Sequence, residues 1–447
     1  MIRYLRLIRH QPLVRNSAAV FCALLAGAAG SFVARVLLAR LAGPTQFGVY
    51  SLVLGWAVML ASIAELGFGP MVLRFVAEYE ARRDYPHLRG VVLHATLVVG
   101  AAGLVGAIGV AWQSHRLSQD YAKAFLIGAP LVPLLGLLQL HKTMLMALKR
   151  PVAGVVIAQW LRYAIFVAAI LVAGYGLGIQ INSVSAVAAV VGVLAVVALT
   201  CYYLVTSSLP DGTYEVRPAY KTRDWFTVAL PLFLVTMADR AFARSDVIIV
   251  GFFRQATEVG YYSAALALAA TADLLMTAVT AVIAPDFARL YANGKVPELQ
   301  HTVTKAARLM FATVLPFAVV LIIFGRPLLL LFGKSFSASR SALSLLALTY
   351  VVNGFTGPVG LLLSQTGGHS LFARVVVVTS ALSLAIELWL VARYGITGAA
   401  AARLTGAVLR SVALSASALF KTGIMPTALG SMTNRLKVLH PAAEGPR

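Results

Sequence analysis

"TQFGVYS" occupies residues 45–51, and 212 positions later the chain carries "TEVGYYS" at residues 257–263. Threonine, glycine, tyrosine and serine stand in the same register in both copies. The first copy follows Gly43-Pro44, a turn-forming pair, and lies between two apolar stretches. We therefore expect it to form a tight connection outside the membrane, with Tyr50 anchored at the interface. The second copy indicates that a larger unit of the chain was duplicated.

The composition points to a membrane protein. The chain has 447 residues, of which 60% are hydrophobic and only 12% are charged. About one quarter of the residues of a soluble domain are charged. The charged residues of this chain are therefore too few to cover the surface of one large soluble protein. Apolar windows of roughly 20 residues, long enough to cross a bilayer as a helix, recur along the whole sequence. Short segments of alternating polarity, the pattern of a transmembrane β-barrel, do not appear. The sequence predicts an all-α polytopic membrane protein.

The apolar windows predict about twelve transmembrane helices. They are expected at residues 17–41, 46–69, 89–112, 122–147, 152–174, 183–206, 226–253, 258–285, 304–324, 338–363, 370–392 and 396–420. An even number of spans places both termini on the same side of the membrane.

The positive charges predict the orientation. With the N-terminus inside, about 23 Lys and Arg residues fall in inside segments and about 8 in outside segments. This asymmetry favours cytoplasmic termini for a multi-pass membrane protein. It also explains the net charge of +21 without a nucleic-acid partner, because the charges are scattered between apolar spans.

The two halves of the chain match beyond the opening motif. "RFVAEYEARRDYPHL" (74–88) has the spacing of "DFARLYANGKVPELQ" (286–300), and "VAGYGLG" (172–178) matches "VARYGITG" (391–398). A duplicated unit of six spans keeps its orientation, which predicts a parallel repeat of two six-helix bundles around a central cavity. The predicted divisions are an N-terminal bundle, a cytoplasmic linker, a C-terminal bundle and a cytoplasmic tail, at 1–206, 207–225, 226–420 and 421–447.

Six arginines fall inside predicted spans, and each needs a reason. They are Arg35, Arg162, Arg240, Arg244, Arg403 and Arg410. An arginine at the centre of a helix costs about 2.5–3.5 kcal/mol on insertion scales. Packed ion pairs or snorkelling to the interface are the structural alternatives to a functional role.

The predicted span at 226–253 carries four of the intramembrane charges. On a continuous helix, Arg240 and Arg244 lie on one face, and Asp239 and Asp246 lie on another. We expect either that one of these faces lines the cavity or that both form packed ion pairs.

Four acids lie at membrane depth and are candidates for ion coupling or charge compensation: Asp273, Asp239, Asp246 and Glu65. A buried carboxyl group can carry a proton when its surroundings disfavour the charged form. Asp273 has no basic neighbour on its own helix, so it is the better candidate for coupling. Asp239 and Asp246 are better explained as partners of the arginines. Coupling to a proton, to sodium or to the membrane potential alone all remain open.

Other chemistry is not indicated. The two cysteines, Cys22 and Cys201, lie in apolar spans and predict neither a disulfide nor a metal site. The outside loops are short and carry no paired carboxylates or metal-ligand pattern. We therefore expect no cofactor, no metal and no enzymatic activity.

Three stretches resemble one family of transporters. They are "LLARLAGPTQFGVYSLVLGWAVMLASIAELGFGPMVLRFVAEY" (37–79), "DRAFARSDVIIVGFFRQATEVGYYSAA" (239–265) and "YGITGAAAA" (394–402). The chain resembles polysaccharide flippases of the multidrug/oligosaccharidyl-lipid/polysaccharide exporter superfamily. The resemblance implies a location in the bacterial cytoplasmic (inner) membrane. It also implies transfer of an undecaprenyl-diphosphate-linked oligosaccharide from the cytoplasmic to the periplasmic leaflet, for surface or exopolysaccharide synthesis. It also implies a polysaccharide polymerase and glycosyltransferases as partners, besides the bilayer and the anionic lipid-linked glycan itself.

A diphosphate substrate would explain the arginines, because guanidinium groups bind phosphate oxygens in pairs and stay charged. We expect Arg35, Arg240 and Arg244 to bind the diphosphate, followed by Arg403 and then by Arg162 and Arg410. The alternatives are a cation-coupled multidrug antiporter of the same fold, a membrane-embedded polysaccharide-assembly enzyme, and a transport-dead scaffold. An antiporter would favour an acidic, aromatic cavity, whereas the internal charges here are mainly basic.

Overall fold

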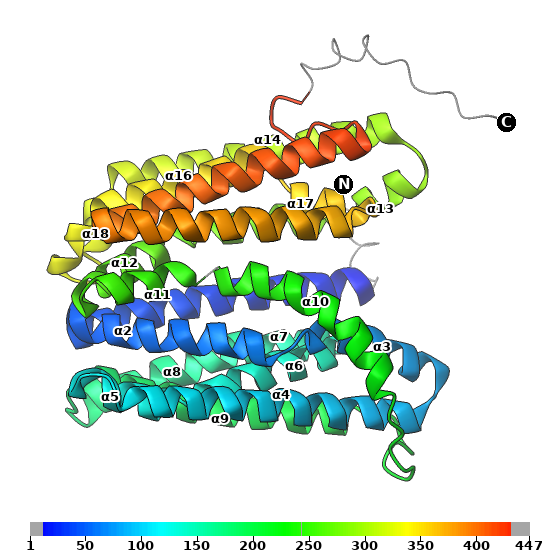
Figure 1. The fold of residues 1–447 in the computed structure, drawn as a ribbon, viewed down its shortest axis with the longest axis horizontal. Coiled ribbons are helices and arrows are strands. Elements are labelled where there is room, and N and C mark those ends of the chain that lie inside the picture. The colour runs from blue at the N-terminus through cyan, green and yellow to red at the C-terminus, as the bar shows by residue number, and fades with distance from the viewer. Residues whose placement is uncertain (1–11, 243, 431–447) are drawn as a thin grey trace. The chain divides into compact units, whose positions relative to one another are not determined.

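The structure of the protein is a computed structural model that describes residues 12–242 and 244–430 (Figure 1). Within these ranges every regular element is a helix. Nine helical stretches in this part of the chain are long and apolar enough to cross a membrane. The prediction of an all-α polytopic membrane protein is confirmed.

The helices follow one another with short connections. They are α2 (Pro12–Ala64), α3 (Phe68–Arg82), α4 (Tyr85–Ser114), α5 (Gln119–Gly128), α6 (Leu131–Ala147), α7 (Pro151–Val155), the π-helix η1 (Val156–Leu161), α8 (Arg162–Leu171), the π-helix η2 (Val172–Gly176), α9 (Ser183–Ser207), α10 (Thr222–Phe242), α11 (Ser245–Phe253), α12 (Ala256–Ala269), α13 (Ala272–Ala292), α14 (Val296–Ile323), α15 (Gly325–Leu329), the 3₁₀ helix η3 (Lys334–Ser339), α16 (Arg340–Thr356), α17 (Val359–Gln365) and α18 (His369–Thr422).

Two of the nine stretches each cover two predicted spans. In α2 the direction changes at Gly43 (φ 76°, ψ 172°), and in α18 it changes at Gly395 (φ 58°, ψ −135°). Only glycine adopts such angles readily. The predicted span at 226–253 is instead divided into α10 and α11. The exact number of spans and the predicted division at 207–225 stay predictions.

The expectation of a turn at "TQFGVYS" is wrong. Residues 45–51 are helical and belong to the second half of α2. Gly43 alone makes the reversal, and Pro44 starts the next helix because its fixed φ suits a first helical position. Tyr50 is only 7% exposed, so it is not an interfacial anchor.

The spacing calculated for the predicted span at 226–253 is also wrong. Arg244 stands between α10 and α11 with non-helical angles (φ −127°, ψ 0°). Because the helix is interrupted there, a rotation of 100° per residue does not carry from Arg240 to Arg244. The same break separates Asp239 from Asp246.

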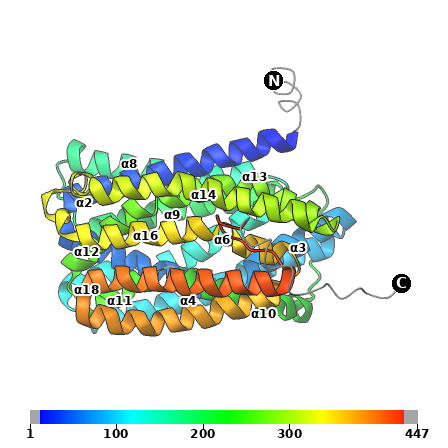
Figure 2. The ribbon, with the colours of Figure 1, turned by 90° about the horizontal axis from the view of Figure 1, so that it is seen from above.

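The contacts between residues divide the chain into two compact units. Unit 1 comprises Met1–Ala267, Pro327–Ser339 and Val391–Ile396, and unit 2 comprises Leu268–Arg326, Arg340–Leu390 and Thr397–Arg447. In unit 1 the long helices α2, α4 and α9 run along one common direction (Figures 1 and 2), as helices of a bundle that crosses a bilayer do. Within unit 2, the long helices α14, α16 and α18 likewise run along one direction that they share with each other.

A hydrophobic core and side-chain hydrogen bonds join the start of α10 and the connection before it to the other helices of unit 1. Trp225 is fully buried, and its Nε1 donates a hydrogen bond to the hydroxyl of Tyr79 over 3.2 Å. Nη1 of Arg89 donates to the carbonyl oxygens of Tyr214 (2.8 Å) and Val216 (2.7 Å). The predicted cytoplasmic linker is therefore fastened to α4 rather than free.

Candidate functional site

The two copies of the opening motif touch each other in unit 1. Oγ1 of Thr45 and Oγ1 of Thr257 are hydrogen-bonded at 2.8 Å, and these residues hold equivalent positions in the repeat. A Cβ added to Gly48 would lie 1.8 Å from the carbonyl oxygen of Ala256. A Cβ added to Gly260 would lie 2.1 Å from the carbonyl oxygen of Pro44. The contact of these two stretches, here named the repeat contact, requires glycine on both helices because the backbones themselves touch.

A cavity of about 160 Å³ lies in unit 1 between α2, α8, α11 and α12. Three of the six predicted arginines line it: Arg35 from α2, Arg162 from the first position of α8, and Arg244 from the break before α11. We name it the arginine cavity. No carboxylate is among the described residues that line it. Its lining therefore favours anions.

A π-helix positions Arg162. The element η1 (Val156–Leu161) widens the helix just before Arg162, and such bulges are frequent at functional sites. Cζ of Arg162 lies 5.1 Å from the ring centroid of Tyr163, within the range of a cation–π interaction. Gly30 on α2 makes room for this ring, since a Cβ there would lie 3.1 Å from Cβ of Tyr163.

Hydroxyl groups complete the lining of the arginine cavity. Tyr50, Ser51, Tyr163 and Ser263 contribute them. The ring of Tyr50 stacks on Phe166 with 6.2 Å between centroids and 8° between planes, which holds its orientation. The cavity thus combines guanidinium groups with neutral hydrogen-bond donors.

A second cavity, of about 300 Å³, shares Val58 and Arg244 with the first. Glu65, which is only 5% exposed, lines it together with Ser62 and Gln139. Gly69 leaves the space that this carboxylate occupies, because a Cβ there would lie 2.1 Å from Oε1 of Glu65. A buried acid therefore borders the same arginine that lines the arginine cavity.

Asp246 has partners on two elements of unit 1. It is 2% exposed, and the hydroxyl of Tyr262 donates a hydrogen bond to its Oδ2 over 2.8 Å. The backbone N–H of Val247 donates to its Oδ1 over 2.8 Å. A carboxylate in the first turn of a helix is favoured by the helix dipole. Asp246 thereby joins the start of α11 to α12, and Tyr262 is the repeat counterpart of Tyr50.

The remaining predicted residues belong elsewhere. The side chains of Asp239 and Arg240 lie outside the described residues. Within unit 2, Asp273 on α13 interacts electrostatically with Arg403 on α18. The base on the helix of Asp273, Arg289, lies at the far end of α13, and Arg403 on another helix is the cation near the carboxyl group. Nη2 of Arg410 donates to Oγ of Ser380 over 2.9 Å, within α18.

Three residues that line the arginine cavity were not expected from the sequence: Tyr50, Tyr163 and Ser263. The signals for Tyr50 and Ser263 were present, because the motif repeats its tyrosine and serine in register. The place of Tyr163 depends on η1, and we know of no sequence pattern that announces this π-helix.

Comparisons with known proteins agree with this fold. The structure is similar to that of a multidrug resistance MATE family transporter of the MOP superfamily in an inward-facing conformation (TM-score 0.74, 14% identity, 88% of this chain and 94% of that chain). It is also similar to the lipid II flippase MurJ in an inward closed conformation (TM-score 0.71, 13% identity, 90% of this chain and 87% of that chain). At such identities the likeness shows the fold alone.

One curated relative and one family match the sequence itself. The probable low-salt glycan biosynthesis flippase Agl15 of Haloferax volcanii is 23% identical over 188 residues, which are 42% of this chain and 40% of the relative's length. The chain thus spans about two fifths of that relative. The family described as polysaccharide biosynthesis protein matches residues 13–291, well over half of the chain. The chain belongs to the polysaccharide biosynthesis protein family, whose relatives here are flippases and transporters.

Proposed function

We propose that this protein is a flippase that moves an undecaprenyl-diphosphate-linked oligosaccharide from the cytoplasmic to the outer leaflet of a bacterial cytoplasmic membrane. The observation that carries the proposal is the arginine cavity: three arginines from predicted spans line it, with no carboxylate among its described lining residues. The similarity to two proteins, a probable glycan biosynthesis flippase and a lipid II flippase, supports it.

The lining suits the charged part of such a substrate. A diphosphate cannot enter hydrocarbon without partners, because an unpaired buried charge costs several kcal/mol. Arg35, Arg162 and Arg244 would bind its oxygens, and each charge-assisted hydrogen bond contributes about 1.5–3 kcal/mol. The hydroxyls of Tyr50 and Tyr163 would add neutral donors. Arg403 and Arg410, in unit 2, and Arg240 remain part of the proposed diphosphate path.

Transport would proceed by alternating access, with residues 1–206 moving against residues 226–420. The repeat contact joins the part of α2 just after Gly43 to the start of α12. The predicted orientation places both at the outer side, so the contact would close that side while the cytoplasmic side is open. Opening the outer side would then require Thr45 to part from Thr257.

Coupling would use Glu65 or Asp273, through a proton or sodium, or the membrane potential alone. Moving one negative charge outward across an inside-negative membrane contributes about 2.3 kcal/mol per 100 mV. Glycosyltransferases would supply the substrate and a polymerase would consume it.

A cation-coupled antiporter is the second candidate. The observation that favours it is Glu65, a buried acid in a cavity of about 300 Å³. The adjoining arginines oppose it, because three guanidinium groups repel a cationic drug.

A deletion strain tests the proposal. Lipid-linked oligosaccharide should accumulate in the cytoplasmic leaflet when the gene is removed, and the wild-type gene should clear it. The triple variant Arg35→Gln, Arg162→Gln and Arg244→Gln should not clear it at equal protein level. A control with three exposed arginines changed to glutamine, Arg82, Arg223 and Arg374, should behave as the wild type. Full clearance by the triple variant would refute the role of the cavity.

A further inference from the structure

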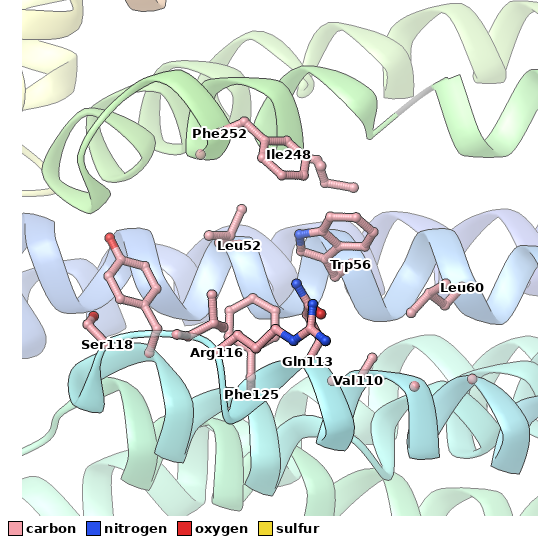
Figure 3. A pocket seen from close by; sticks show the side chains of 15 residues that line it. Leu52, Trp56, Leu60, Val110, Gln113, Arg116, Ser118, Phe125, Ile248 and Phe252 are labelled. Atoms are coloured by element: carbon pink, nitrogen blue, oxygen red, sulfur yellow. The ribbon is translucent and has the colours of Figure 1, made fainter.

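A further groove, which is mainly apolar, lies in unit 1 apart from the two cavities described above. Its volume is about 640 Å³, and its walls come from α2, α4, α5 and α11. This size falls in the range of about 300–1,000 Å³ that is typical of small-molecule sites. Trp56 and Phe252 meet edge to face across it, with 5.9 Å between ring centroids and 77° between planes. Figure 3 shows Ile248 and Phe252 pointing from α11 toward α2.

The polar side chains of the groove are gathered at one end. Gln113, Arg116, Ser118 and Tyr121 all come from the end of α4 and the start of α5. Figure 3 shows Gln113 of α4 and Arg116 of the connection after α4 on the side of the groove that faces Trp56. The rest of the lining is hydrocarbon, glycine or aromatic rings. The groove therefore matches an amphiphile that has a long apolar chain and an anionic head.

The groove and the arginine cavity are separated by one pair of helices. On α2, Gly55 lines the arginine cavity and Trp56 lines the groove. On α11, Val247 lines the cavity and Ile248 lines the groove. A Cβ added to Gly55 would lie 3.5 Å from Cγ1 of Ile248, an ordinary contact distance. The arginine cavity and the groove thus lie on opposite sides of the same pair of helices, α2 and α11. A substrate whose head group leaves the cavity has an apolar groove for its chain nearby.

We infer that the groove binds the prenyl chain of the lipid-linked substrate, with the diphosphate held by Arg116 as the product reaches the outer leaflet. This rests on the proposed flippase function and on the predicted orientation, which places Arg116 in an outer connection, directly after α4. A prenyl diphosphate brings one chain and a multiply charged head, which fits a single groove with one cationic end. Bulk phospholipid is the competing occupant.

Gly109 permits a clean test. It lines the groove, and a Cβ added there meets nothing within 4 Å. The substitution Gly109→Phe should therefore place a ring in the groove without a clash at its Cβ. Gly192 on α9 is the matched control, because it is equally open and lies outside the groove. The substitution Arg116→Gln removes the charge and leaves the apolar walls intact.

The probe is undecaprenyl diphosphate with a photoreactive diazirine on its chain, added to the purified full-length protein in phosphatidylglycerol nanodiscs. Labelled peptides should contain Trp56, Phe125 or Phe252. Gly109→Phe should lower this labelling at least tenfold, and Gly192→Phe should leave it unchanged. Arg116→Gln should weaken labelling by the diphosphate but not by a diazirine-bearing undecaprenol.

Three outcomes would overturn the inference. Labelling that lies outside the groove and depends on Arg35 and Arg244 would refute the groove while the flippase proposal stands. If excess phosphatidylglycerol reduces the labelling as much as unlabelled undecaprenyl diphosphate does, the groove binds bulk lipid. An absence of specific labelling anywhere on the protein would contradict both proposals.

Discussion

The substitution Gly48→Ala should open the repeat contact. The added carbon would lie 1.8 Å from the carbonyl oxygen of Ala256, whereas ordinary contacts begin at 3.4 Å. The two backbones must then part by about 1.6 Å, the difference between these distances. The same displacement would lengthen the 2.8 Å hydrogen bond between Thr45 and Thr257 to about 4.4 Å, beyond hydrogen-bonding range.

The energy follows from these distances. Overpacking costs about 1–3 kcal/mol, and the loss of an exposed hydrogen bond adds at most about 1 kcal/mol. A cost of about 2 kcal/mol would shift the equilibrium between closed and open forms about 30-fold. The Gly55→Ala variant is the control on the same helix, because its Cβ would sit 3.5 Å from Ile248. It should change the equilibrium little.

Disulfide formation measures this shift. The two native cysteines, Cys22 and Cys201, are free and are replaced by alanine. Thr45→Cys and Thr257→Cys are then introduced, and mild oxidation is followed on a gel after cleavage at a protease site placed in the predicted linker at 207–225. The pair should cross-link readily with Gly48 or with Gly55→Ala, and far more slowly with Gly48→Ala. Equal rates with glycine and alanine at position 48 would refute the steric reasoning, and no cross-link in any background would refute the contact itself.

Three further outcomes are expected. Arg244→Lys should restore less than half of the transport lost in Arg244→Gln, measured as clearance of the lipid-linked substrate, because an ammonium group lacks the paired donors of guanidinium. Tyr262→Phe should destabilise the purified protein by about 1–3 kcal/mol in thermal or denaturant unfolding, because it removes a hydrogen bond to the buried Asp246. Burial raises the pKa of Asp84, but hydrogen bonds from the ring and backbone of His87 outweigh this and hold that pKa below its usual value. Asp84→Ala should therefore cost about 1 kcal/mol at pH 7, the value of a helix cap, and the difference from wild type should shrink as the pH falls below about 4.

The fold could be predicted because the bilayer imposes a local rule. A span must bury its own backbone hydrogen bonds and expose apolar side chains, so length and hydropathy alone identify it. The position of a reversal is subtler. Gly43 makes the turn with one unusual φ angle, and the helix resumes at once, so the motif at 45–51 was expected to be a loop although it is a helix.

The sequence indicates which charges need an explanation but not how they are arranged. The cost of burying arginine made Arg35, Arg162 and Arg244 candidates, because a charge within an apolar span can be recognised from the sequence. Which of them share a cavity depends on helix breaks that one sequence does not reveal. Arg162 was ranked low, yet η1 brings it into the same cavity as Arg35. The rank of Arg240 rested on an unbroken helix, and that helix is broken before Arg244.

The most direct test of the central claim is transport by the purified protein alone. Proteoliposomes would contain a fluorescent undecaprenyl-diphosphate oligosaccharide, and a membrane-impermeant lectin would report how much reaches the opposite leaflet over time. We expect rapid transfer by the wild type, transfer near the protein-free rate by the triple variant of Arg35, Arg162 and Arg244, and near-normal transfer by the triple variant of exposed arginines. Equal transfer by the wild type and the cavity variant, or transfer by the wild type no faster than in protein-free liposomes, would contradict this expectation.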